Sequence, residues 1–243
     1  MTQPTEFSPG LVIRNFTPPL RLKDFKLIAF DMDSTLINIE CVDEIADAAG
    51  RKEEVAAITE AAMRGEIADY KESLRRRVAL LQGVPLTALQ AVYDHRLQLN
   101  PGAETLIEAC RRAGLRIVLL SGGFTFFTDR LRDRLGLDDT RANVLEIEDE
   151  RLTGRMLAQP WGDICDGDAK RDKLLECCRA LGVSPDRAIA MGDGANDLPM
   201  LRVAGLSVAY RAKPAVRDEA MLRIDEGGLD RLLDFLQDAG TPR

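Results

Sequence analysis

The chain has 243 residues, of which 45% are hydrophobic and 30% are charged, and its formal net charge is −7. This composition is ordinary for a globular protein of one large domain, or of one domain that carries an insertion. The acidic balance argues against a nucleic-acid or acidic-membrane partner, although an anionic small substrate can still bind in a locally positive pocket.

The N-terminal third begins with a proline-rich segment and then a strand. Prolines at positions 4, 9, 18 and 19 predict that residues 1–22 form an extended, loosely ordered lead-in. The apolar run Leu27–Phe30 predicts a buried strand, and Asp31 and Asp33 follow it directly. Two like charges at a buried strand end are costly for stability alone. The pair therefore indicates a metal site, a nucleophile, or an acid beside a nucleophile.

Residues 39–100 contain no convincing strand, and their apolar spacing predicts helices instead. The expected helices are Val42–Ala49, Glu53–Arg64, Tyr70–Leu81 and Leu86–His95. That is too much helix for one crossover between strands. We expect residues 39–100 to form a small helical cap inserted into an α/β core of residues 23–38 and 101–243.

The rest of the chain alternates strands and helices. Further buried strands are expected at Arg116–Leu120, Ala188–Met191 and Leu206–Tyr210. The helices between them end at glycines, which are the usual left-handed helix terminators. The expected helices are Ala103–Ala113, Phe124–Leu135, Lys170–Leu181 and Leu198–Ala204. This order predicts a Rossmann-like, doubly wound parallel sheet, with an additional hairpin at Asn143–Met156.

Three more motifs lie at or near predicted strand ends. Ser121-Gly122-Gly123 offers a hydroxyl and unobstructed backbone N–H groups to an anion, just before a helix, although this motif alone favours a plain strand-to-helix turn. Lys170 begins a helix and is, alone, typical of a solvated surface charge. Gly192-Asp193-Gly194-Ala195-Asn196-Asp197 holds two carboxylates with little bulk between them, which favours a hard cation such as Mg²⁺ over an Asp/Gly-rich turn.

Together these four motifs, in this order, resemble the haloacid dehalogenase superfamily of phosphohydrolases and, within it, the phosphoserine phosphatase family. The resemblance extends over roughly Lys26 to Arg231. The matching segments are Asp31–Leu36, Glu40–Ala46, Ala62–Glu66, Ser73–Val78, Ser121–Phe124 and Gly192–Asp197.

The resemblance implies a mechanism and a set of site residues. Asp31 would be the nucleophile that forms an aspartyl-phosphate, and Asp33 the acid and base. Mg²⁺ would be held by Asp31, the Asp33 backbone carbonyl and Asp193. The phosphoryl ligands and outer-shell residues that the resemblance implies are Ser121, Gly122, Lys170, Asn196 and Asp197.

Substrate choice is expected to lie in the cap. Glu40 would pair with the ammonium of phosphoserine and an arginine with its carboxylate. Of the consecutive Arg75, Arg76 and Arg77, a helix can turn only one into the pocket, and the family pattern favours Arg77. Met63 and Tyr70 would form an apolar rim that excludes water.

The expected reaction is the last step of serine biosynthesis: hydrolysis of a small phosphorylated amino acid. One alternative is a phosphotransferase that passes the phosphoryl group from Asp31 to an alcohol such as homoserine. Another is a phosphatase for a different small phosphomonoester. A signalling receiver domain also uses a strand-end Asp, Mg²⁺, a hydroxyl and a lysine, but it needs neither Asp33 as an acid nor a helical insertion.

Location and assembly are constrained less tightly. The five cysteines lack metal-ligand spacing and fit a reducing cytoplasm. No apolar run approaches the ~20 residues of a membrane span, and the N-terminus lacks a signal-peptide pattern. We therefore expect a cytoplasmic protein with no membrane partner, and a homodimer remains an open option.

Overall fold

The computed structural model describes residues 4–63, 66–67 and 69–236 of the chain. Its strands are β1 (Thr5–Ser8), β2 (Leu11–Ile13), β3 (Leu27–Phe30), β4 (Arg116–Phe124), β5 (Asp139–Glu148), β6 (Arg151–Leu157), β7 (Ala188–Gly192), β8 (Leu206–Tyr210) and β9 (Leu222–Ile224). Its α-helices are α1 (Cys41–Ala48), α2 (Lys52–Met63), α3 (Tyr70–Ala79), α4 (Leu86–His95), α5 (Ala103–Arg112), α6 (Thr125–Leu135), α7 (Gly167–Leu181), α8 (Leu198–Val203) and α9 (Pro214–Glu219).

All of these strands join one mixed sheet in the order β1-β2-β9-β8-β7-β3-β4-β5-β6. The pairs from β9 to β5 are parallel, whereas β1–β2, β2–β9 and β5–β6 are antiparallel. The first parallel strand, β3, has β4 on one side and β7 on the other. The chain therefore reverses its winding direction next to β3, and such a switch point is where ligands bind in open α/β sheets. The expected α/β doubly wound core is confirmed.

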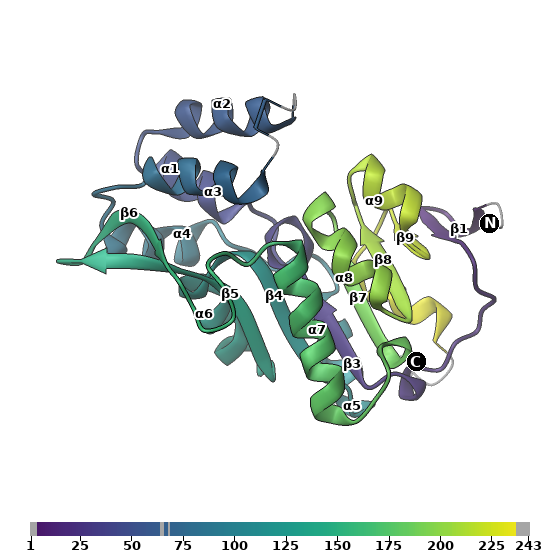
Figure 1. The fold of residues 1–243 in the computed structure, drawn as a ribbon. Coiled ribbons are helices and arrows are strands. Elements are labelled where there is room, and N and C mark those ends of the chain that lie inside the picture. Colours follow the sequence, from purple (N-terminus) through teal and green to yellow (C-terminus); the bar gives the residue numbers. More distant parts are fainter. Residues whose placement is uncertain (1–3, 64–65, 68, 237–243) are drawn as a thin grey trace.

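Helices cover both faces of the sheet (Figure 1). Alternate residues of β3 point to opposite faces, as strand geometry requires. Ile28 and Phe30 belong to the apolar cluster that includes α5 and α6, and Leu27 and Ala29 to the cluster that includes α7 and α8. Because β3 is buried on both faces, its sequence is continuously apolar rather than alternating.

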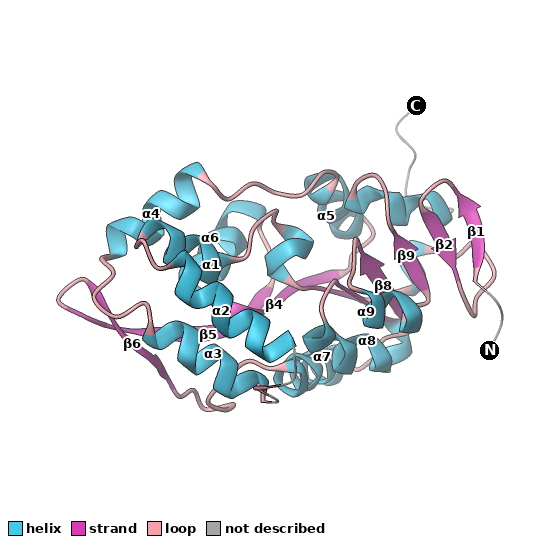
Figure 2. Cartoon of the chain, turned by 90° about the horizontal axis from the view of Figure 1, so that it is seen from above, coloured by secondary structure: helices cyan, strands magenta, loops and turns pink. Residues whose placement is uncertain are grey.

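Helices α1 to α4 lie between β3 and β4 in the sequence and gather at one end of the molecule (Figures 1 and 2). Each corresponds to an expected helix within a few residues at either end. The β5–β6 hairpin, expected at Asn143–Met156, extends beneath α3 (Figure 1). In this article the helical insertion means residues 39–100.

The N-terminal segment differs from its expectation as a loose lead-in. Strands β1 and β2 form a hairpin, and Leu11 of β2 pairs with Ile224 of β9. Leu11 is fully buried, so this segment belongs to the core. Prolines at positions 4, 9, 18 and 19 flank these short strands rather than interrupt them, so the strands can still form an edge of the sheet.

Two other expectations need adjustment. Strand β4 does not end at Leu120 but continues through Ser121-Gly122-Gly123 to Phe124, with an irregular register against β5. Helix α6 begins at Thr125, one residue later than expected and with Phe124 as its N-cap, so the glycines lie in the last part of a distorted strand just before the helix. Short strand β9 was not expected.

In the described part of the chain, no helix combines the length and apolar character that a membrane crossing requires.

Candidate active site

The motifs meet at the carboxyl ends of β3, β4 and β7, where a cavity of about 600 Å³ opens. Core residues that line it include Asp31, Asp33, Gly122, Gly123, Asp193 and Asn196. The helical insertion supplies the opposite wall, which includes Glu40, Asp43, Tyr70, Ser73 and Arg77. Side chains from distant parts of the sequence thus face one enclosed space, as parallel strand ends predict.

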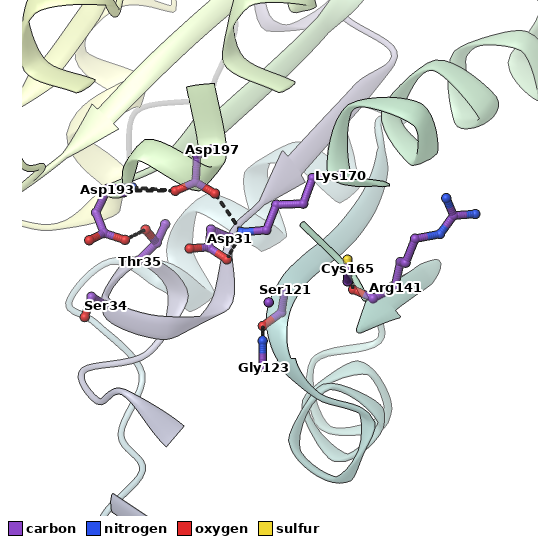
Figure 3. A network of polar contacts seen from close by, with 12 residues as sticks. Asp31, Ser34, Thr35, Ser121, Gly123, Arg141, Cys165, Lys170, Asp193 and Asp197 are labelled. Atoms are coloured by element: carbon purple, nitrogen blue, oxygen red, sulfur yellow. Dashed lines mark hydrogen bonds and ion pairs between the residues drawn. The ribbon is translucent and has the colours of Figure 1, made fainter. Parts of the chain in front are cut away.

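Lys170 is the central cation of the core side (Figure 3). Its fully buried Nζ donates to Asp31 Oδ1 at 2.6 Å and to Asp197 Oδ1 at 2.7 Å. Lys170 lies in the first turn of helix α7. Asp166 caps this helix by accepting a hydrogen bond from the Ala169 N–H, which stabilises the turn that carries Lys170. Burial opposes the charge of Lys170, but the two carboxylates outweigh it and raise its pKa well above the usual value. Lys170 is a buried site residue and not a surface charge.

Asp197 organises the loop after β7. Its Oδ2 accepts from the backbone N–H groups of Asp193 at 3.1 Å and Gly194 at 3.0 Å. A Cβ at Gly192 would lie 2.4 Å from the same oxygen, so only glycine allows this close approach. Both carboxylate oxygens of Asp197 are therefore engaged by protein donors.

Asp31 and Asp193 have more bonding capacity left. Asp31 Oδ2 has no described protein donor, and Asp193 accepts a hydrogen bond from the Thr35 hydroxyl at 3.2 Å. Burial and the neighbouring Asp197 raise the pKa of Asp31 well above its usual value and that of Asp193 to about 6. Burial and the neighbouring carboxylate therefore disfavour the ionised forms of Asp31 and Asp193, and a bound cation would favour them.

The acidic group fits a divalent cation. Ligand oxygens of Asp31, Asp193 and Asp197 lie within 4.8 Å of one another. Three carboxylates share the buried ammonium of Lys170, and the largely exposed Lys213 ammonium lies 3.8 Å from Asp193, so negative charge still exceeds positive charge in the cluster. Oxygen ligands of this kind are what Mg²⁺ prefers. Since Asp197 is already satisfied, Asp31 and Asp193 are the carboxylates available for direct ligation.

Asp33 has different surroundings from Asp31. Its Oδ1 accepts from the Cys41 N–H, at the start of α1, at 3.0 Å, and no lysine or arginine pairs with it in the described residues. Desolvation, followed by the charge of Glu40, raises its pKa to about 7. A carboxyl with this pKa exchanges a proton near neutral pH, as a general acid and base must.

The turn between the two aspartates and the insertion is strained. Ser34 has a left-handed backbone, with φ of 57°, and its N–H donates to the Ile39 carbonyl. Its hydroxyl donates to Glu40 Oε1 at 2.7 Å. This contact places Glu40 at the mouth of the cavity, and the strain at Ser34 is of a kind that concentrates at functional sites.

The Ser121-Gly122-Gly123 segment forms the floor beside Asp31 (Figure 3). The Gly123 N–H donates to the buried Ser121 hydroxyl at 2.8 Å. Asn143 donates to the Gly122 and Gly123 carbonyls, which fixes the distorted end of β4. No sequence pattern predicts a role for Asn143, because an asparagine in a polar hairpin is common.

On the insertion side, Tyr70, Ser73 and Arg77 share one face of α3 and line the cavity. Arg75 and Arg76 point elsewhere and pair with Asp163 and Glu72. The Tyr70 hydroxyl lies against Gly122, where a Cβ would come within 2.1 Å of it. Tyr70 thus presents a polar atom to the cavity, where an apolar rim was expected.

Two further predicted or overlooked residues complete the site. Met63 ends α2, but its side chain lies outside the part of the chain whose side chains are described. Lys213 was not anticipated. It follows β8, its N–H donates to the Asp193 carbonyl, and its Nζ lies 3.8 Å from Asp193 Oδ2. Its position just beyond a parallel strand end was the one available signal.

Comparison with known proteins identifies relatives of this arrangement. A family profile of haloacid dehalogenase-like hydrolases matches residues 25–205. The phosphoserine phosphatase of Polaromonas sp. (strain JS666) is 72% identical over 97% of this chain and 100% of its own length. The phosphoserine phosphatase of Albidiferax ferrireducens is 68% identical, over 96% of this chain and 99% of its own.

Solved structures agree with the sequence relatives. A haloacid dehalogenase family hydrolase from Salmonella enterica serovar Typhi superposes with a TM-score of 0.83 at 40% identity, covering 90% of this chain and 73% of its own. A phosphoserine phosphatase solved as an analogue of its phospho-aspartyl intermediate has a TM-score of 0.80 at 37% identity. The match covers 88% of this chain and 99% of that one.

Proposed function

The chain belongs to the haloacid dehalogenase-like hydrolases and, within them, to the phosphoserine phosphatases, and we propose that it hydrolyses O-phosphoserine to serine and phosphate. The observation that carries this proposal is the inequality of Asp31 and Asp33 within one cavity. Asp31 accepts a hydrogen bond from a buried lysine, whereas Asp33 accepts one from the Cys41 N–H, has no cationic partner among the described residues and has a pKa of about 7. The first suits a nucleophile and the second a proton carrier.

Asp31 Oδ2, Asp193 and the backbone carbonyl of Asp33 would hold Mg²⁺, and Asp197 would support them from outside. When bound, the cation supplies positive charge between the attacking carboxylate and the phosphoryl group. Asp197 keeps Lys170 and the Asp193–Gly194 backbone in place through the three hydrogen bonds described above.

Phosphoryl transfer would then depend on residues of the floor. The Ser121 hydroxyl, the Gly122 N–H and Lys170 would bind the phosphoryl oxygens, with Asn196 at the rim. Asp31 attacks phosphorus, and the bond from phosphorus to the serine oxygen breaks while Asp33 gives that oxygen its proton. Water then attacks the phosphoryl-aspartate, and Asp33 takes a proton from it, which returns both carboxyls to their first state.

Substrate choice is assigned to the insertion wall. Glu40 would bind the ammonium and Arg77 the carboxylate, and both line the same cavity as Asp31. An arginine guanidinium matches a carboxylate in shape as well as charge. Tyr70 and Met63 would shield the reacting phosphoryl group from bulk water.

The test is release of phosphate from phosphorylated metabolites, with Mg²⁺ and with a chelator. We expect phosphoserine to be hydrolysed best, only with Mg²⁺, and without diversion of phosphate to added homoserine. Asp31→Asn should abolish turnover while phosphoserine still binds, as measured by calorimetry. Appreciable hydrolysis by Asp31→Asn would exclude Asp31 as nucleophile, and a better substrate of another class would replace phosphoserine.

A further inference from the structure

Two polar atoms on the insertion wall are buried without a hydrogen-bond partner: Asp43 Oδ1 and Arg77 Nε. Both residues line the cavity. One atom is an acceptor and the other a donor, and leaving either unpaired when water is excluded is unfavourable. This wall of the cavity therefore holds one acceptor, Asp43 Oδ1, that lacks a donor, and one donor, Arg77 Nε, that lacks an acceptor.

Glu40, the expected ammonium partner, is already partly occupied. Its Oε1 accepts from the Ser34 hydroxyl at 2.7 Å. Asp43 lies three residues further on, within the first turn of α1, so the two side chains can share one face. Burial, and then the charge of Glu40, raises the pKa of Asp43 above its usual value. A cation bound between Asp43 and Glu40 would offset both the cost of burying the Asp43 charge and its repulsion by Glu40.

Arg77 does not provide that cation directly. In the described part of the chain, no hydrogen bond or ion pair within 4.0 Å joins Arg77 to Asp43, although its charge is near enough to lower the pKa of Asp43. The carboxylate and the guanidinium thus face the same cavity without closing on each other. A zwitterion, with an ammonium and a carboxylate on one carbon, would satisfy both.

We propose that Asp43 is a specificity-determining residue that accepts a hydrogen bond from the substrate's α-ammonium beside Glu40. This inference rests on the proposed function, which assigns the substrate carboxylate to Arg77. It makes the amino-group subsite a pair of carboxylates on one turn of α1. Selection of an α-amino acid ester over an ester without the amino group would then depend on Asp43.

A competing explanation is that Asp43 only stabilises α1. An acidic residue in the first turn of a helix is favourable whether or not it contacts a ligand. That role would make Asp43→Asn equally harmful toward every substrate. A comparison between substrates separates the two roles, because folding defects cancel from the ratio of two activities of one enzyme preparation.

The experiment compares four phosphate esters. Phosphoserine carries an ammonium and a carboxylate, phosphoethanolamine only the ammonium, 3-phosphoglycerate only the carboxylate, and p-nitrophenyl phosphate neither. For Asp43→Asn we expect kcat/KM to fall about 10- to 100-fold more on the two ammonium esters than on the other two, as for loss of a charged hydrogen bond. Arg77→Ala should instead penalise the two carboxylate esters.

Asp47→Asn is the matched control, since Asp47 is one turn further along α1 and pairs with Arg96 and Lys52. It should leave all substrate ratios unchanged. Equal losses on all four esters for Asp43→Asn, or losses that follow the carboxylate, would overturn the assignment of Asp43. A wild-type enzyme inactive on phosphoserine would instead refute the proposed function, and the ammonium subsite with it.

Discussion

Asp31 and Asp33 are separated by one residue, and burial raises the pKa of both, yet their neighbours differ. Lys170 donates to Asp31, whereas Asp33 accepts from the Cys41 N–H, has no cationic partner among the described residues and faces the charge of Glu40. Local sequence alone does not distinguish the two carboxylates, and it was the family resemblance that implied different roles for them. Their difference arises from residues that the fold brings from α7 and α1.

The pKa of Asp33 has a consequence for stability. The pKa of Asp33 is about 7 in the folded protein against an ordinary value of 3.8, so the folded state binds this proton more tightly than the unfolded state does. Well below pH 3.8 the carboxyl is protonated in both states and there is no penalty. The penalty grows as pH rises and is complete above about pH 7, where it reaches at most about 4 kcal/mol.

We therefore predict that Asp33→Asn stabilises the metal-free protein several times more at pH 8 than at pH 4.5, while it abolishes turnover. Asparagine keeps the oxygen that accepts from Cys41 and removes the charge. Urea unfolding in chelator at both pH values measures the effect, with the exposed Asp172→Asn as control. A stabilisation that is the same at both pH values would mean that the charge is not its cause.

At the scale of elements, the β5–β6 hairpin connects the sheet to the helical insertion. Backbone hydrogen bonds join its tip to the turn between α3 and α4: Gly83 N–H to the Leu152 carbonyl, Leu152 N–H to Val84, and Leu86 N–H to Glu150. Gly154 of β6 lies close to the end of α3. The hairpin therefore sets the position of the helix that carries Tyr70, Ser73 and Arg77.

Gly154→Ala should disturb this contact. Its φ is 82°, and a Cβ there would lie 3.1 Å from the Ala79 carbonyl oxygen. We expect a loss of about 1–2 kcal/mol from backbone strain. We also expect a larger fall in kcat/KM for phosphoserine than for p-nitrophenyl phosphate, because a shift of α3 moves Arg77.

Gly83→Ala provides the control for Gly154→Ala. Its φ is 81°, but a Cβ there would meet nothing within 4 Å. It should show a similar loss in urea unfolding with no change in substrate preference. If both variants changed substrate preference equally, backbone strain rather than the contact between β6 and α3 would be responsible.

At the scale of the whole molecule, the sequence predicted the parts that follow from parallel strand topology. Strand ends converge, so Asp31, Ser121 and Asp193 could be placed together before any coordinates, and the family resemblance added Lys170. Apolar periodicity also located α1 to α4. Each of these features follows from a local sequence pattern, either an apolar strand that ends in polar residues or apolar residues at helical spacing.

The features that the sequence did not predict depend on contacts between distant segments. Asn143 can donate to the Gly122 carbonyl only because β5 pairs with β4 at that point. The Lys213 N–H donates to the backbone carbonyl of Asp193, which lies on a different loop. Strand β2 has only three residues, and its pairing with β9 is what identifies it as a strand. A short polar or proline-flanked segment carries too little local information to reveal such contacts.

The N-terminal hairpin yields a prediction that separates stability from function. Leu11 is fully buried, and β2 is separated from β3 by β9, β8 and β7. Leu11→Ala should cost about 2–5 kcal/mol of unfolding free energy, because it removes buried methyl groups and leaves a cavity. Under conditions where the variant is fully folded, kcat/KM for phosphoserine should stay at the wild-type value.

Urea unfolding and the phosphate assay measure the two quantities, and the exposed Thr5→Ala on β1 should change neither. A fall in activity of folded Leu11→Ala would show that the distant sheet edge is coupled to the site, since the intervening strands would then have to transmit the change.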